Sequence, residues 1–99
     1  MAEEQRERAR LDREIAGLRA KRCQLDLALG EFLHEARRTR DALERVGGRS
    51  HALHAKARAL KDNIRLTRRD LADCECQIEK LRRRLVALDT GGATGRDEG

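Results

Sequence analysis

One stretch decides the fold of this chain: Val46-Gly47-Gly48-Arg49-Ser50. Two adjacent glycines inside a helix cost about 2 kcal/mol relative to alanine, and glycine readily adopts the left-handed backbone that ends a helix. Ser50 is a favourable N-cap for a second helix that starts at His51. The stretch therefore predicts two helices joined by a tight turn.

Apolar residues on both sides of this stretch recur at alternating steps of four and three, which is the a/d pattern of a coiled coil. The pattern keeps its phase across the interruption. We call this series the seam, and it consists of Leu11, Ile15, Leu18, Arg22, Leu25, Leu29, Phe32, Ala36, Thr39, Leu43, Val46, Ser50, Leu53, Ala57, Leu60, Ile64, Thr67, Leu71, Cys74, Ile78, Leu81, Leu85 and Leu88. The chain is therefore built to pack helix on helix.

The seam and the charges beside it favour different folds. A hairpin does not require the phase to survive the turn, so the preserved phase favours one continuous helix. Folding the chain about residue 48 instead brings opposite charges together, in the pairs Asp12 with Arg82, Arg19 with Glu75, Asp26 with Arg68, Glu14 with Arg84, and Glu35 with Lys56. A parallel dimer of one long helix would oppose like charges, in the pairs Glu7 with Asp12, Lys56 with Lys61, and Asp70 with Glu75. Flanking charges set helix orientation in coiled coils.

We therefore predict an all-α fold, an antiparallel helical hairpin that assembles into a larger helical bundle. A single long helix in a two-stranded coiled coil is the alternative. In the hairpin, folding about residue 48 places Leu18 level with Ile78 and Phe32 level with Ile64.

The predicted hairpin divides the chain into five segments. They are a charged N-terminal extension of the first helix (1–10), the first coiled-coil helix (11–46), the turn (47–50), the second coiled-coil helix (51–88) and a glycine-rich tail (89–99). The tail shows no periodicity, and we expect it to be disordered.

Composition excludes several classes of protein. The chain has 99 residues, of which 41% are charged, with one Phe and neither Trp nor Tyr, so a thick globular core is not expected. No apolar run approaches the roughly 18 residues of a membrane span. The acidic start of the chain does not resemble a secretory signal, and three cysteines suit free thiols. We expect an intracellular protein, cytoplasmic or cytoskeletal, with a nuclear location as an alternative.

No residues suggest catalysis, a cofactor or a small-molecule substrate. Cys74 and Cys76 are two apart, so on a helix their side chains point about 200° apart and cannot share a metal ion. His51 and His54 are one turn apart, but no carboxylate or thiol is placed to complete a site. We therefore expect no catalytic or metal-binding residues.

Two sets of residues outside the seam are candidates for binding a partner. The first is a back face of small and apolar residues, and it comprises Ala16, Ala20, Cys23, Leu27, Leu33 and Leu66. The second is a set of outward-facing arginines that comprises Arg37, Arg38, Arg65, Arg69 and Arg83. The back face suits a second copy or another coiled-coil protein. The arginines suit an acidic filament surface or nucleic acid.

The net charge of +5 lies mostly in the second half of the chain, since residues 1–46 hold 11 basic and 10 acidic side chains whereas residues 50–89 hold 10 and 6. We expect a non-enzymatic structural or interaction protein, a small coiled-coil subunit or adapter of a larger intracellular assembly. An electrostatic binder of nucleic acid or another polyanion is one alternative. A helical-hairpin chaperone or a secretion-stalk component is the other.

Overall fold

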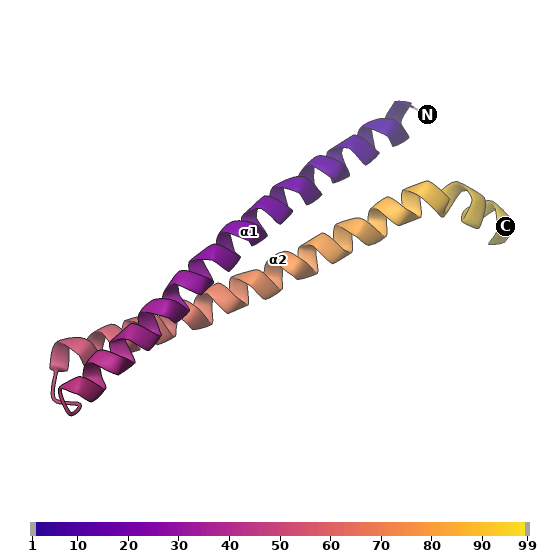
Figure 1. The fold of residues 1–99 in the computed structure, drawn as a ribbon. Coiled ribbons are helices and arrows are strands. Elements are labelled where there is room, and N and C mark those ends of the chain that lie inside the picture. Colours follow the sequence, from indigo (N-terminus) through magenta and orange to yellow (C-terminus); the bar gives the residue numbers. More distant parts are fainter. Residues whose placement is uncertain (1, 99) are drawn as a thin grey trace. The chain divides into compact units, whose positions relative to one another are not determined.

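The computed structural model consists of two helices, α1 (Ala2–Arg45) and α2 (His51–Glu98), which pack against each other as an antiparallel hairpin (Figure 1). It describes the backbone of residues 2–98 and the side chains of residues 2–90, and within that range it contains no strand. The predicted all-α hairpin is confirmed. Assembly into a larger bundle stays a prediction.

Helix α1 ends because the glycine pair closes it. Gly47 and Gly48 have φ angles of 64° and 72°, in the left-handed region that side chains disfavour. The Gly48 N–H donates to the Leu43 carbonyl at 2.8 Å, and the Gly47 N–H donates to the Glu44 carbonyl at 3.1 Å. These are the two hydrogen bonds of a Schellman motif, which satisfies carbonyls at a helix C-terminus.

Helix α2 begins because Ser50 caps it. The Leu53 N–H donates to Ser50 Oγ at 3.1 Å, as expected when Ser50 is the N-cap and Leu53 the third helical residue. One turn into the helix, Nε2 of His54 lies 2.8 Å from the Gly48 carbonyl oxygen. The turn thus uses its own backbone and side chains to join the two helices, as the sequence predicts.

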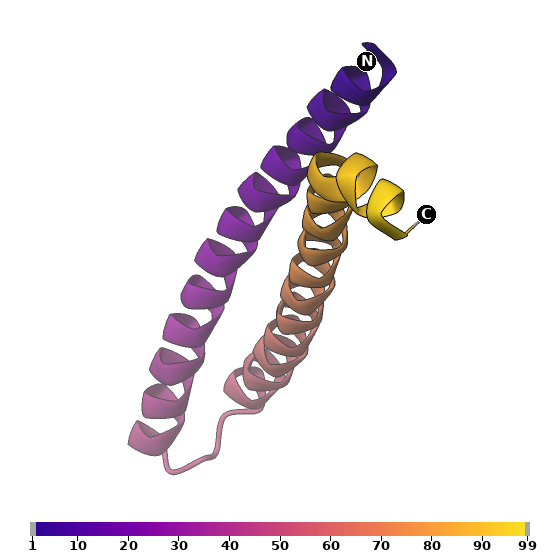
Figure 2. The ribbon, with the colours of Figure 1, turned by 90° about the vertical axis from the view of Figure 1, so that its right-hand side faces the viewer.

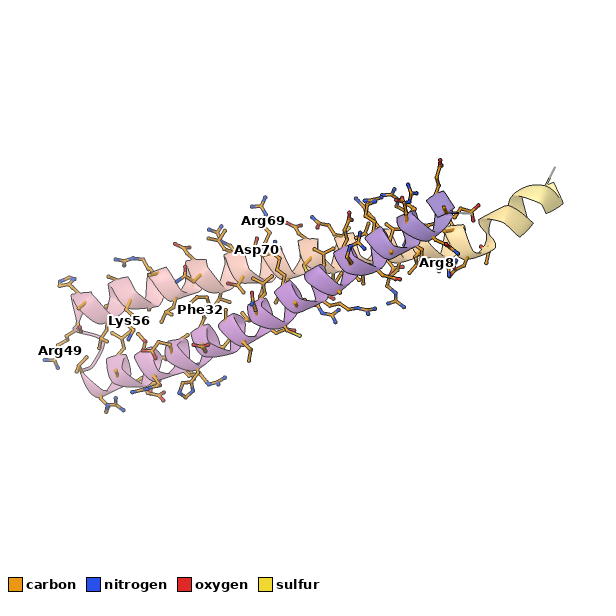
Figure 3. The ribbon with its side chains drawn as sticks, turned by 90° about the horizontal axis from the view of Figure 1, so that it is seen from above. Arg8, Phe32, Arg49, Lys56, Arg69 and Asp70 are labelled. Atoms are coloured by element: carbon orange, nitrogen blue, oxygen red, sulfur yellow. The ribbon has the colours of Figure 1, made fainter. Side chains whose placement is uncertain are left out.

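The chain divides into two compact units, each built from one segment of α1 and one of α2. We call Met1–Arg22 with Asp73–Gly99 the end unit, and Cys23–Ala72 the turn unit. The two segments of the turn unit lie side by side in both views of the ribbon (Figures 1 and 2). Phe32 lies between them in Figure 3.

The predicted seam forms the core of each unit. In the end unit Leu11, Ile15, Cys74 and Ile78 are buried, with Leu11 fully enclosed. In the turn unit the buried members are Thr39, Leu60, Thr67 and Leu71. Every other seam residue is half-buried except Val46, which is 45% exposed in the turn. Over the side chains of residues 2–90, burial along both helices therefore follows the four-three spacing.

The register between the helices differs from the predicted one by about one turn. In the end unit the Cys74 thiol donates to the Leu18 carbonyl at 3.1 Å, so Cys74 rather than Ile78 lies level with Leu18. Helix α1 ends at Arg45 and α2 begins at His51, so the turn itself is centred on residue 48 and the shift lies in how the two helices pack against each other.

This register changes the predicted ion pairs. Glu35 with Lys56 is confirmed, at 2.5 Å. The prediction for Arg84 is wrong, because its partner is Glu7 at 3.3 Å, whereas Glu14 pairs with Arg10 at 2.6 Å. The other three predicted pairs are also wrong, since none of them approaches within 4.0 Å among the described side chains: Asp12 with Arg82, Arg19 with Glu75, and Asp26 with Arg68.

The helical backbone of α2 continues into segment 89–99, where the sequence suggests no periodicity. The side chains of residues 91–98 and the whole of Gly99 lie outside the described part of the chain. Disorder of this segment stays a prediction.

Candidate protein-interaction surfaces

The back-face residues predicted from the sequence lie on the outside of the two units. Leu27 is 70% exposed and Leu66 is 49% exposed, both within the turn unit. Leu33 is half-buried beside the seam. The small residues Ala16, Ala20 and Cys23 are exposed. These side chains are thus available to a partner, and Leu27 is the large apolar residue that the fold covers least.

The five candidate arginines are also exposed: Arg37, Arg38, Arg65, Arg69 and Arg83. Two of them make long ion pairs along their own helix, Arg65 with Asp62 at 3.6 Å and Arg83 with Glu79 at 3.4 Å. Arg69 points away from α1 (Figure 3). Exposed pairs of this kind hold a side chain only weakly, so these guanidinium groups can turn toward an external anion.

The turn unit carries a groove of about 670 Å³ that joins an apolar floor to a basic wall. Its floor is Ala36 of α1 with Ala57 and Ile64 of α2, and its wall comprises Lys61, Asp62, Arg65 and Arg68. The groove is hollow because alanine occupies the seam on both helices at this level. We call it the basic groove.

A second surface of the turn unit surrounds Leu27 and is acidic. Leu27 shares an open groove of about 680 Å³ with Asp26, Gly30, Glu31, Phe32, His34, Glu35 and Leu60. A Cβ built on Gly30 would meet nothing within 4 Å, so the backbone beside Leu27 is bare. We call Leu27 with Asp26, Gly30 and Glu31 the acidic knob.

Ion pairs in each unit depress the pKa of one carboxyl. In the turn unit the hydrogen bond from Lys56 lowers the pKa of Glu35, and the positive charge of Lys56 adds to this. In the end unit two hydrogen bonds from Arg10, at 2.7 and 2.8 Å, lower the pKa of Glu7. The positive charge of Arg84 lowers it further. Each carboxylate therefore has a cation on the facing helix, Lys56 for Glu35 and Arg84 for Glu7. Glu7 also has Arg10, which lies one turn along its own helix.

The cysteines do not gather into a metal centre or a disulfide. All three thiols are free, with Cys74 buried and Cys23 and Cys76 exposed. Among the described side chains no group of three potential metal-ligating residues is found. The Cys74 thiol acts as a donor inside the core, since it bonds the Leu18 carbonyl.

The sequence did not single out the floor of the basic groove. The four-three spacing places Ala36 and Ala57 in the seam like its other members, and Lys61 and Arg68 among the charges that flank it. The signal that could have found them is the coincidence of two alanines at one level, and it appears only in the register that the structure has.

Comparison with protein-family models, with curated proteins and with solved structures finds no match to this chain. Neither of the two helices, over the residues that the structure describes, is long and apolar enough to cross a membrane.

Proposed function

We propose that this chain is a non-enzymatic interaction protein, a small coiled-coil subunit or adapter of a larger assembly. The observation that carries the proposal is Leu27, which stays 70% exposed although the seam of both helices is already used within the hairpin. Isolated apolar side chains are common on protein surfaces. Leu27, however, lines an open groove together with Phe32 and Leu60, so it is not an isolated apolar side chain.

The chemistry of this surface suits a protein partner. Burial of an apolar side chain such as Leu27 against a partner lowers the free energy of the complex. The bare backbone at Gly30 lets another helix approach closely. The carboxylates of Asp26 and Glu31 at its edge would give orientation rather than affinity. An intracellular location and a place in the cytoskeleton stay predictions.

The test is site-specific photo-crosslinking in cells that express the full chain. A photoreactive residue at position 27 is expected to crosslink to protein, either a second copy or another polypeptide. The same group at the exposed position 13, in the end unit, is the matched control and is expected to crosslink far less. Absence of any protein adduct specific to position 27 would contradict the proposal.

A second candidate is an electrostatic binder of a polyanion, and the basic groove favours it. Lys61, Arg65 and Arg68 line that groove against one acidic residue, Asp62. Binding of a nucleic acid duplex should fall steeply between about 50 and 200 mM salt, because released counterions drive it. Affinity that does not depend on salt, or that survives Arg65→Glu with Arg68→Glu, would contradict this candidate.

A further inference from the structure

We infer that the partner of the acidic knob is a second copy of this chain, and that Leu27 of one copy inserts into the basic groove of the other. This inference rests on the proposed function and narrows its partner. It is carried by the presence, on one turn unit, of two surfaces whose shape and charge complement each other.

The basic groove has the form of a receptor. Ala36, Ala57 and Ile64 provide an apolar floor, and the space above it is about 670 Å³. That volume lies within the range of sites that enclose a ligand, and it accommodates the side chains of one helical turn. The groove is open to the outside because Ala36 and Ala57 fill so little of the seam.

The acidic knob has the form of a ligand for that groove. Leu27 projects with 70% of its surface exposed, and it therefore does not fill the groove of its own chain. Gly30, one turn further along α1, has no side chain to hold a partner away. A leucine beside a glycine on a straight helix resembles the anchors of helix-in-groove recognition.

The charges of the two surfaces are opposite. The groove carries Lys61, Arg65 and Arg68 with a single acid, Asp62. The knob carries Asp26 and Glu31, both exposed, and neither makes an ion pair within 4.0 Å among the described side chains. A polyanion would match the groove but would leave the knob unexplained.

The contact is heterologous, because the knob and the groove are different patches of one chain. Such a contact adds copies head to tail: it ends in a closed ring, of which a reciprocal dimer is the smallest, if its rotation closes, and in an open filament if it does not. It thus predicts that the mass of the wild-type chain grows with concentration beyond that of a dimer or stops at a closed ring.

The experiment mixes two variants that each lack one half of the contact. Leu27→Glu removes the knob and keeps the groove, whereas Arg65→Glu with Arg68→Glu reverses the groove and keeps the knob. Light-scattering mass of the full chain is measured for the wild type, for each variant and for their mixture, and circular dichroism verifies that each stays helical. The matched controls are Val86→Glu and Arg58→Glu, which are exposed and line neither surface.

We expect the wild type and both controls to associate, and each half-contact variant to associate at least about tenfold more weakly, as expected for the loss of one buried leucine. The mixture should form a complex of one copy of each, with twice the chain mass of 11.3 kDa and no larger species.

Several results would overturn the inference. A monomeric wild type at high concentration would do so, as would two helical variants that fail to combine. Loss of association in the Arg58→Glu control would show a general charge effect instead. If the wild type is monomeric but position 27 crosslinks to another polypeptide, the self-recognition is wrong while the proposed function stands. If the wild type is monomeric and binds a nucleic acid duplex through Arg65 and Arg68, the inference is wrong and the basic groove binds a polyanion instead.

Discussion

Replacement of Gly47 and Gly48 by alanine should convert the hairpin into a continuous helix. Both glycines have φ angles in the left-handed region, 64° and 72°. No cis bond or proline shapes the turn, so the reversal depends on these two backbones and on the capping hydrogen bonds. The seam keeps its phase through the turn, so a continuous helix would carry an unbroken stripe of apolar residues and could pair with a second chain.

The magnitude follows from the two states. In the hairpin each alanine would adopt the left-handed conformation at about 1–2 kcal/mol per residue. In a continuous helix each alanine is favoured over glycine by about 1 kcal/mol. Together the two replacements move the balance by about 4–6 kcal/mol toward the continuous helix. That is comparable with the entire free energy of unfolding of a small domain, roughly 5 kcal/mol or more.

Energy transfer within one chain is the assay that separates the two states. Donor and acceptor dyes are placed at Ala9 and Ala87, which are exposed. In the end unit these positions adjoin the ion pairs of Arg8 with Asp89 and Glu7 with Arg84. In a continuous helix they would be about 117 Å apart, at 1.5 Å per residue. Labelled chains are diluted into an excess of unlabelled chain, so that transfer between chains is negligible, and the three native cysteines are replaced by alanine in every variant.

Gly17→Ala is the matched control. Gly17 lies inside α1, its backbone is helical and a Cβ there would meet nothing within 4 Å. This replacement should stabilise the hairpin by about 1 kcal/mol and leave the energy transfer high. Efficient transfer in the double variant, together with unchanged stability, would refute the reasoning, because it would show that the turn does not depend on glycine.

The structure makes three further predictions about stability, each measured by urea or thermal unfolding. Thr67→Val should stabilise by about 1 kcal/mol, because a methyl group replaces the hydroxyl of a core residue that is 7% exposed; Thr39→Val should gain less, since the Thr39 hydroxyl donates to the Glu35 carbonyl at 2.8 Å. Equal gains at both positions would contradict this. Ser50→Ala should destabilise by about 1 kcal/mol through loss of the cap on α2, and no loss would show that the cap is dispensable. Acidification should destabilise the hairpin, because the pKa of Glu35 is lowered: its contribution is present above the usual value of about 4.5 and disappears as the pH falls through the lowered pKa. Glu35→Gln should make unfolding less sensitive to pH in that window, and an unchanged pH profile would refute the assignment.

The core of both helices could be predicted from the sequence because it depends only on local spacing. A four-three repeat fixes which side of each helix faces a partner, whichever partner that is. Leu11 and Ile78 are therefore buried as predicted, and so is the polar Thr39. The turn could be predicted for a similar reason, since Gly47 and Ser50 act through bonds to residues at most four positions away.

The register could not be predicted because it depends on how the seam residues of the two helices pack against each other. The opposite charges that fold together about residue 48 are surface pairs, which contribute too little to set a register. The Schellman bond from Gly48 to Leu43 fixes where α1 ends, but the turn between Arg45 and His51 is centred on residue 48 and does not account for the shift. A difference of one turn preserves the seam on both helices and yet changes every partner across it. The pair Glu35 with Lys56 forms because the observed register brings these two residues almost level.

The same difference of one turn determines the candidate site. A groove requires two small residues of the seam at the same level, and the sequence holds few of them. In the predicted register Ala36 would have faced Leu60, whose side chain would have filled the space. In the observed register Ala36 and Ala57 line one groove, and the cations of Lys61 and Arg65 lie at its edge. The basic groove thus follows from the register of the two helices, and a shift of one turn would close the surface that we propose receives a second copy.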